Sequence, residues 1–446
     1  MSERLFGTDG IRGVANIAPM TAEMALQVGR AAGILFQKDK RPHTILIGKD
    51  TRRSCYMIEN ALTAGLCSVG MRVLLTGPLP TPGVSYIMRS LRCDGAIMIS
   101  ASHNSFEDNG IKIFGRDGYK VADEFEDEIE RIIKTGEAEK VRPTGGEIGT
   151  AKRIDDAVGR YIEFVKASFP KGMRLDGLRI VLDCANGATY KVGPYTLEEL
   201  GAEVIPLGTS PDGLNINKHI GSVYPEEMRA TLIREKAHVG ISFDGDGDRV
   251  VMADENGRLL DGNALLAMIG VDYLEREALP NNQLVTTIMA NGGLDRALAP
   301  FGGSTVRTKV GDRYVVEAMR DKGLLVGGES SGHIVLFEHN TTGDAMMAAL
   351  KVLAIMIRKD QPLSRIAQCY QEMPESHKKV PLNGKKRPSQ EQLDALVAAI
   401  APQLSGGRAV VRPSGTEPIV RIMVQHEEIR TAETLTQALA EQVAAL

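Results

Sequence analysis

A strand, a turn, a helix and a second strand follow one another three times along this chain, each time with a glycine two residues before the second strand. The strand pairs are expected at residues 44–47 and 72–75, 178–182 and 203–207, and 284–288 and 304–308. Short apolar runs that alternate with helical stretches are typical of α/β folds. Repetition at this scale favours three related domains, although any parallel sheet would give a similar pattern.

Polar stretches rich in glycine or proline divide the chain. They lie at residues 135–149, 254–257 and 373–388. Beyond the last, a helix at residues 390–400, two strands and a closing amphipathic helix are expected, a pattern typical of a small α+β domain. We therefore predict an α/β fold with three similar mixed-sheet domains and a smaller α+β C-terminal domain around a central cleft. The predicted domains are residues 1–150, 151–254, 255–370 and 371–446.

Charge and aromatic content exclude some classes of function. The 446 residues hold 53 lysines and arginines against 57 aspartates and glutamates, a formal net charge of −4. Bulk nucleic-acid binding depends on a basic field, which is missing here. Aromatic residues make up 4% of the chain, without tryptophan, which leaves little for base stacking. We therefore expect no nucleic-acid partner.

Cysteine usage and hydropathy bear on the cellular compartment. Five cysteines, an odd number without Cys-x-x-Cys spacing, argue against a disulfide framework or a cysteine zinc site and fit a reducing cytosol. The amino terminus has no apolar signal core. No apolar run reaches the about 18 residues of a membrane span. We expect a cytoplasmic protein with no membrane partner.

A polar loop, Ser-Ala-Ser-His-Asn at residues 100–104, follows the apolar run at residues 95–99. Ligands collect just past the carboxyl ends of strands in open α/β sheets, and a serine there becomes a nucleophile when it is activated. Ordinary turn chemistry would explain the same residues. Because neither serine of this loop stands in a Gly-x-Ser-x-Gly pattern, an α/β-hydrolase is disfavoured here.

Three aspartates, Asp244, Asp246 and Asp248, alternate with glycines after the apolar run at residues 239–243. Such close carboxylates repel one another strongly unless a cation joins them, and clustered oxygen ligands suit a hard divalent cation. An EF-hand begins similarly, but Arg249 stands where that loop requires glycine, and the flanks resemble strands. We predict a Mg²⁺ site that holds a phosphate; a solvated acidic turn is the alternative.

Two further loops offer groups for a sugar and a phosphate. Glycines frame Glu329, Ser331 and His333, which can bond sugar hydroxyls and move a proton near neutral pH. The loop at residues 412–418, with Arg421 beyond it, offers free N–H groups and guanidinium groups to a phosphate. A structural turn and a plain hairpin are the alternatives. We expect all four loops to meet in one cleft. Their groups together predict phosphoryl transfer to or from a phosphosugar.

The four motifs, in this order, resemble the α-D-phosphohexomutase superfamily over essentially the whole chain. They read Ser-Ala-Ser-His-Asn, Asp-Gly-Asp-Gly-Asp-Arg, Gly-Glu-x-Ser-Gly-His and Arg-Pro-Ser-Gly-Thr-Glu-Pro. Residues 6–13 and 310–314 resemble the bacterial amino-sugar branch, which interconverts glucosamine 6-phosphate and glucosamine 1-phosphate for UDP-N-acetylglucosamine and cell-wall precursor synthesis. Ser330 stands where that branch more often has Gln and glucose or mannose enzymes have Met, so neutral hexose phosphates are the alternative substrates.

The resemblance also implies catalytic roles. It implies a phosphate on Ser102 in the active enzyme, general acid–base roles for Lys112 and His333, and positions beside the reacting phosphate for Arg12 and His103. The family usually has proline after Ser-His-Asn, where this chain has Ser105.

Ligand-binding residues follow in the same way. The implied ligands of one Mg²⁺ per subunit are the Ser102 phosphate, Asp244, Asp246 and Asp248. The implied phosphosugar-binding residues are Arg249, Glu329, Ser331, Arg412, Ser414, Gly415, Thr416 and Arg421. Activation by glucosamine or glucose 1,6-bisphosphate and a homodimer are further implications.

Overall fold

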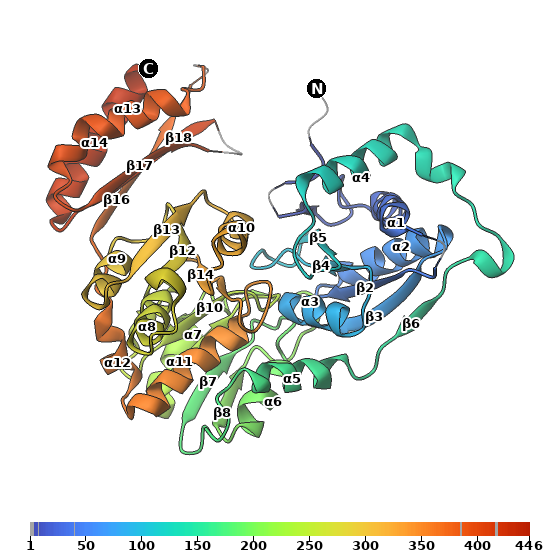
Figure 1. Cartoon of the computed structure of the whole chain (residues 1–446), viewed down its shortest axis with the longest axis horizontal. Helices are drawn as coiled ribbons and strands as arrows, with labels where there is room; N and C mark the ends of the chain where they lie inside the picture. Colours follow the sequence, from blue (N-terminus) through green and yellow to red (C-terminus); the bar gives the residue numbers. More distant parts are fainter. Residues whose placement is uncertain (1–3, 8, 40, 384–385, 415–417) are drawn as a thin grey trace.

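The computed structural model describes residues 4–7, 9–39, 41–383, 386–414 and 418–446 (Figure 1). Four sheets follow one another along the chain: three mixed sheets covered by helices, then a smaller antiparallel sheet with two α-helices on it. The predicted fold class is confirmed. In Figure 1 the first domain (blue to teal) and the C-terminal domain (red) stand apart. The second domain (green) adjoins the first, and the third (yellow to orange) lies next to the C-terminal domain.

The first sheet has the strand order β1-β5-β4-β2-β3-β6. Its strands are β1 (Ile11–Val14), β2 (Thr44–Lys49), β3 (Arg72–Pro78), β4 (Gly95–Ile99), β5 (Asp108–Gly115) and β6 (Ala151–Arg153). Its helices are α1 (Ala22–Phe36), α2 (Ser54–Ser68), α3 (Thr81–Ser90) and α4 (Asp123–Thr135), with short 3₁₀ turns at Glu137–Lys140 and Gly145–Glu147. Because β6 pairs with β3, this sheet reaches three residues past the boundary predicted at residue 150.

The second sheet has the order β11-β10-β9-β7-β8. Its strands are β7 (Arg179–Asp183), β8 (Glu203–Leu207), β9 (Val239–Phe243), β10 (Val250–Ala253) and β11 (Leu259–Leu260). Helices α5 (Ala157–Ala167), α6 (Val192–Glu199) and α7 (Glu226–Glu235) belong to this domain.

The third sheet has the order β13-β12-β14-β15. Its strands are β12 (Gln283–Thr287), β13 (Ser304–Thr308), β14 (Val326–Gly328) and β15 (Ile334–Leu336). Its helices are α8 (Gly262–Glu275), α9 (Gly293–Leu298), α10 (Asp312–Lys322), α11 (Ala345–Lys359) and α12 (Leu363–Ile366), with 3₁₀ turns at Pro280–Asn282, Ala299–Phe301 and Ala367–Cys369.

The C-terminal sheet has the order β16-β18-β17, with β16 (Glu375–Pro381), β17 (Arg408–Pro413) and β18 (Ile419–Gln425) all antiparallel. Helices α13 (Gln390–Ile400) and α14 (Ile429–Ala445) cover one face, and a 3₁₀ turn lies at Ala401–Gln403. The Ser389 side chain and Gln392 close a capping box that fixes the start of α13.

One topology recurs in the first three sheets. A central strand has two parallel neighbours, and an antiparallel strand is added beside the second neighbour: β3-β2-β4-β5, β8-β7-β9-β10 and β13-β12-β14-β15. The three predicted loops with Ser102, Asp244 and Glu329 all join the last two strands of this unit. Each therefore leaves its sheet at the same topological position.

Packing unites the first three domains and sets the fourth apart. A continuous cluster of buried apolar side chains includes residues of all three mixed-sheet domains, with α8 and α11 buried along most of their length. The C-terminal domain has a separate core between its sheet and its two helices. In the described part of the chain, no helix combines the length and the apolarity needed to cross a membrane.

Candidate active site

Ser102 is buried in the loop between β4 and β5, and its hydroxyl faces the second domain. Its Oγ donates to Asp244 Oδ2 at 2.6 Å and lies 3.4 Å from His103 Nδ1. Its φ is +52°, in the left-handed region that costs a residue with a side chain about 1–3 kcal/mol. Contacts around the loop must therefore hold it in this conformation.

Arg52 supplies several of these contacts from inside the first domain. Its guanidinium is fully buried, and Nη2 donates to the carbonyl oxygens of Ser102 and Asn104 at 3.0 and 2.9 Å. Nη1 donates to the carbonyl of Asp108 at 3.0 Å, and Nε donates to Asp50 Oδ2 at 2.8 Å. A buried charge with this many fixed acceptors anchors the whole loop.

The second domain holds the same two carbonyl groups through Asn217. Its Nδ2 lies 2.9 Å from the carbonyl oxygen of Ser102 and 2.9 Å from that of Asn104. Gly245 allows the aspartate loop to approach the serine loop this closely, because a Cβ at that position would lie only 2.6 Å from the carbonyl oxygen of Ser102. The serine loop is therefore fixed by both domains at once.

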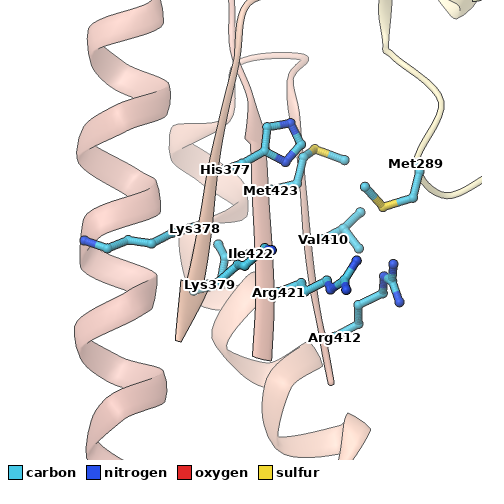
Figure 2. Close-up of a pocket in the computed structure, with 9 residues that line it drawn as sticks. All are labelled: Met289, His377, Lys378, Lys379, Val410, Arg412, Arg421, Ile422 and Met423. Carbon is cyan, nitrogen blue, oxygen red and sulfur yellow. The ribbon is translucent and has the colours of Figure 1, made fainter. Parts of the chain in front are cut away.

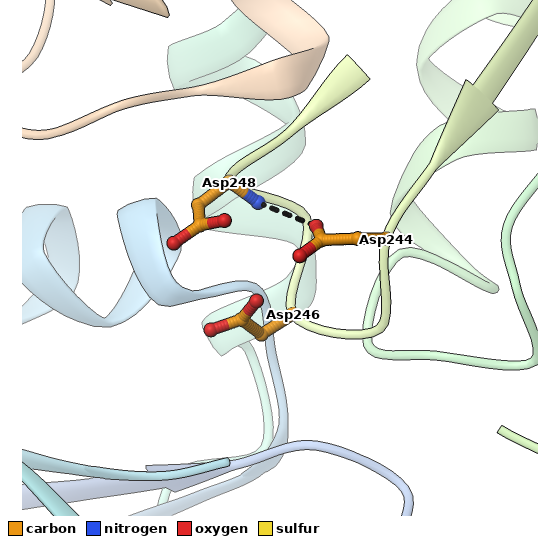
Figure 3. A group of neighbouring side chains, drawn as sticks. All are labelled: Asp244, Asp246 and Asp248. Carbon is orange, nitrogen blue, oxygen red and sulfur yellow. Dashed lines mark hydrogen bonds between the residues drawn. The ribbon is translucent and has the colours of Figure 1, made fainter. Parts of the chain in front are cut away.

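The carboxylates of Asp244, Asp246 and Asp248 converge in the loop between β9 and β10 (Figure 3). One oxygen atom from each lies within 4.8 Å of the other two. The backbone N–H of Asp248 donates to Asp244 Oδ1 at 3.2 Å. Gly247, with φ of +70°, makes the turn that carries the third aspartate back toward the first.

This triad fits a metal ion. All three side chains are buried, and Oδ1 of Asp246 and Oδ1 of Asp248 have no hydrogen-bond partner among the described residues. Buried acceptors are normally satisfied, and clustered carboxylate oxygens are the ligands of hard divalent cations. Burial, followed by the charges of Asp248 and Asp246, raises the pKa of Asp244 well above its usual range. A cation would relieve this repulsion.

Lys112 and Arg12 bring positive charge to the triad from the first sheet. The buried Lys112 Nζ lies 3.1 Å from Asp246 Oδ2, 3.3 Å from Asp9 Oδ2 and 3.7 Å from Asp248 Oδ2. Burial opposes its charge, but these three carboxylates outweigh that effect and raise the pKa of Lys112. Arg12 pairs with the same Asp9 at 2.8 Å. Both cations thus lie at the edge of the predicted metal site.

His103 is held by Arg249, the residue that follows the triad. Arg249 Nη1 donates to His103 Nδ1 at 3.1 Å. Burial, and then the charges of Arg249 and Arg12, lower the pKa of His103 to about 4. The ring is therefore neutral at pH 7, and its Nδ1 accepts a proton in a hydrogen bond rather than donating one. This contact places the Arg249 guanidinium beside Ser102.

His333 joins the third domain to the triad. Its Nδ1 lies 3.6 Å from Asp248 Oδ2, and its Nε2 lies 3.7 Å from Asp312 Oδ2. Its backbone forms an isolated bridge with Arg249. The ring packs on Gly343, where a Cβ would lie 2.5 Å from ring atoms. His333 is therefore fixed against the metal-binding loop.

Glu329 and Ser331 lie in the same loop between β14 and β15. Glu329 Oε1 accepts from the Gly311 N–H at 3.2 Å, and burial raises the pKa of this carboxyl group. Ser331 is exposed. The loop thus presents one fixed carboxylate and one accessible hydroxyl, the kinds of group that bind sugar hydroxyls.

The C-terminal domain carries a separate cluster. Arg412 and Arg421 line a cavity of about 290 Å³ together with residues of β16 and Met289 of the third domain (Figure 2). Ser414 is buried at the end of β17, whereas the predicted Gly415 and Thr416 lie outside the described residues. No residue that lines this cavity comes from the serine or aspartate loop. The structure therefore gathers three of the four predicted loops and places the fourth in a second cluster.

Reasoning from the sequence missed the residues that organise this site. These are Asp9, Arg52, Lys120, Asn217 and Asp312. Lys120 Nζ contacts both Asp9 and Asp312, and so joins the first domain to the third. Arg52 had a usable signal, because it follows the first strand of a repeat, where functional groups collect. Asn217 had none, since it lies in an irregular loop.

The chain matches the four domain families described as phosphoglucomutase/phosphomannomutase. Alpha/beta/alpha domains I, II and III match residues 3–140, 159–257 and 261–373, and the C-terminal domain matches residues 378–442. Together these matches cover most of the chain.

Curated relatives and solved structures agree with these matches. A phosphoglucosamine mutase of Anaeromyxobacter dehalogenans is 51% identical over 99% of this chain and 98% of its own, and one of Syntrophotalea carbinolica is 50% identical over 99% and 97%. A phosphoglucomutase/phosphomannomutase family protein of Burkholderia thailandensis has the same fold, with a TM-score of 0.82 at 24% identity over 100% of this chain and 98% of its own. The chain belongs to the phosphoglucomutase/phosphomannomutase family, within the α-D-phosphohexomutase superfamily that its four motifs resemble.

Proposed function

We propose that this protein acts as a phosphoglucosamine mutase, which interconverts glucosamine 6-phosphate and glucosamine 1-phosphate through a phosphoserine at Ser102 and a 1,6-bisphosphate that stays bound. The single observation that carries this proposal is the 2.6 Å contact between Ser102 Oγ and Asp244, inside a buried acidic triad. Relatives of that activity, about half identical over nearly the full chain, support the amino-sugar substrate.

Mg²⁺ is the metal that we propose for the triad. The donor set is carboxylate only, without a histidine or cysteine, which favours a hard cation. When bound, Mg²⁺ supplies charge neutralisation at the phosphoryl oxygens and makes the serine oxygen a better leaving group. Asp244, Asp246 and Asp248 would hold it, and the Ser102 phosphate would supply a further oxygen.

The chain's own residues organise the transfer. The sugar hydroxyl oxygen forms a bond to phosphorus while the bond from phosphorus to Ser102 Oγ breaks, and the hydroxyl proton passes to Lys112 or His333, whichever is unprotonated when the substrate is bound. Arg249, fixed by His103, and Arg12, paired with Asp9, lie where they can bind the phosphoryl oxygens. In the second half-reaction, Ser102 Oγ forms a bond to the other phosphate of the bisphosphate while the bond from that phosphorus to the sugar oxygen breaks. This step restores the phosphoserine and releases the product.

The substrate's second phosphate needs its own site, because it must be held while the first one reacts. Arg412, Ser414 and Arg421 supply this site in the proposal, and Gly415 and Thr416 belong to the same predicted loop. Glu329 and Ser331 bind two sugar hydroxyls that take equivalent positions in both orientations of the bound sugar. The C-terminal domain, with its separate core, would close on the bound substrate and exclude water from the phosphoserine.

The proposed function is tested with purified, phosphorylated protein and Mg²⁺ on glucosamine 6-phosphate, glucose 6-phosphate and mannose 6-phosphate in parallel. We expect kcat/KM for glucosamine 6-phosphate to exceed the other two by about 10²-fold or more. Equal turnover of glucose or mannose phosphate would reassign the substrate and make Ser330 the first residue to exchange. Release of inorganic phosphate as the main product would contradict a mutase.

Replacing Asn217 with alanine should lower kcat about tenfold and leave KM nearly unchanged, because it loosens the serine loop without touching a substrate-binding group. Two hydrogen bonds are lost, each worth about 1 kcal/mol of unfolding free energy, which urea denaturation measures. Asn215→Ala is the matched control, since in the described part of the chain the Asn215 side chain bonds only to Asp212 and Ser210 within its own loop. A kcat equal in both variants would show that Arg52 positions the loop alone.

Cytoplasmic location, a homodimer and activation by a sugar 1,6-bisphosphate stay predictions. The proposed substrates are soluble sugar phosphates, which agrees with the predicted cytoplasmic location.

A further inference from the structure

Three cationic side chains form a row across the C-terminal sheet. Arg421 on β18 is the direct cross-strand partner of Lys379 on β16 and of Arg412 on β17. Residues directly opposite in an antiparallel ladder share one face, with Cβ atoms about 5 Å apart. Figure 2 shows the three side chains on the face that looks toward Met289. Sequence reasoning identified the two arginines, but it passed over the lysine.

This row places three like charges side by side. Like charges directly opposite one another in a sheet are destabilising, and burial together with the charge of Arg421 lowers the pKa of Arg412. Among the described residues, no carboxylate lies within 4.0 Å of the side-chain nitrogen atoms of Lys379 or Arg412. The acid on this face, Glu375, is bonded to His377 at 2.7 Å and to Gln425 at 2.8 Å.

The neighbours of Lys379 have structural contacts that it lacks. Lys378 also lines the cavity, but its side chain points to the other face, where Nζ donates to Gln437 of α14 (Figure 2). Val380 is buried in the domain core. Lys379 itself is exposed and lines the cavity of Arg412 and Arg421. Among the described residues, the charge of Lys379 therefore stabilises neither the domain core nor a surface ion pair.

We propose that Lys379 is a third phosphate-binding side chain of the C-terminal cluster, next to Arg412 and Arg421. This inference rests on the proposed mutase function for its substrate and on the sheet register for its geometry. A phosphate dianion would attract all three cations, and Lys379 can donate to it from the β16 side. Because the non-transferring phosphate occupies this cluster in both half-reactions, Lys379 acts equally on glucosamine 6-phosphate and glucosamine 1-phosphate.

The test compares Lys379→Ala with Lys378→Ala, which removes the same charge one residue away on the opposite face. In steady-state kinetics, Lys379→Ala should raise KM about fivefold to twentyfold in both directions and leave kcat within about twofold. Lys379→Arg should recover most of the affinity. Lys378→Ala should leave KM within about twofold. Equal KM values in the two alanine variants, or a change in kcat alone, would overturn the proposal.

A binding measurement separates this proposal from the proposed function. Inorganic phosphate is titrated calorimetrically into the wild type, Lys379→Ala, Lys378→Ala and Arg421→Ala. Weaker binding in both Lys379→Ala and Arg421→Ala supports the three-cation site, even if the wild type turns over no glucosamine phosphate. Weaker binding in Arg421→Ala alone, with Lys379→Ala equal to the wild type, shows that the cluster binds phosphate without the lysine.

Discussion

Replacing Ser102 with alanine should lower turnover of glucosamine 6-phosphate by about 10⁴-fold or more. The variant loses the oxygen that forms and breaks the bond to phosphorus, whereas the backbone contacts to Arg52 and Asn217 remain possible. A coupled assay measures turnover, and intact-mass spectrometry after incubation with glucose 1,6-bisphosphate measures phosphorylation. The wild type should gain one phosphoryl group and the variant none.

Ser105→Ala is the matched control for this experiment. Ser105 is exposed on the same loop, so its removal changes the hydroxyl content of the loop without touching the proposed nucleophile. It should be phosphorylated and turn over like the wild type. If Ser102→Ala retained more than about a hundredth of wild-type turnover, the phosphoserine mechanism would be wrong.

Replacing Asp246 with asparagine should lower turnover about 10³-fold or more and remove stabilisation by Mg²⁺. The substitution replaces one of three anionic ligands, a carboxylate whose Oδ1 has no partner among the described residues, with a neutral amide. A ligand that binds only the folded state at 100 times its Kd stabilises it by about 2.7 kcal/mol. Thermal unfolding with and without Mg²⁺ should therefore show a rise in Tm for the wild type and little for the variant.

Asp176→Asn provides the comparison, because it removes a carboxylate from the same domain at an exposed pair with Arg174. Its Tm should respond to Mg²⁺ as the wild type does. A chelator should abolish wild-type turnover, and added Mg²⁺ should restore it. An undiminished Mg²⁺ shift in Asp246→Asn would move the metal site away from the triad.

Local patterns predicted much of the fold. The apolar runs at residues 95–99 and 239–243 coincide with β4 and β9, and the helix expected at residues 390–400 coincides with α13. Buried parallel strands are continuous apolar runs, so their limits are visible in the sequence. The three-residue strands β14 and β15 are too short for such a signal.

The site was predicted unevenly for a related reason. Motif residues such as Asp244 stand next to the other residues of their motif, so their chemistry can be recognised from a short stretch of sequence. Arg52 and Asn217 act through carbonyl groups 50 and 115 residues away, and backbone acceptors have no signature in a sequence. Lys112 near Asp246, 134 residues apart, came from the family resemblance rather than from spacing. Contacts between domains are set by packing, which no local pattern reports.

The equivalent positions of the three loops suggest how this scaffold can acquire new substrates. Each loop joins the same two strands of its repeat, so the proposed nucleophile, metal ligands and sugar contacts each stand on a sheet of their own. Grafting residues 329–331 from a relative with another sugar preference, which leaves His333 in place, should alter selectivity without disturbing phosphorylation of Ser102. The sugar-binding positions of this loop could then change while the serine and metal loops keep their contacts with each other.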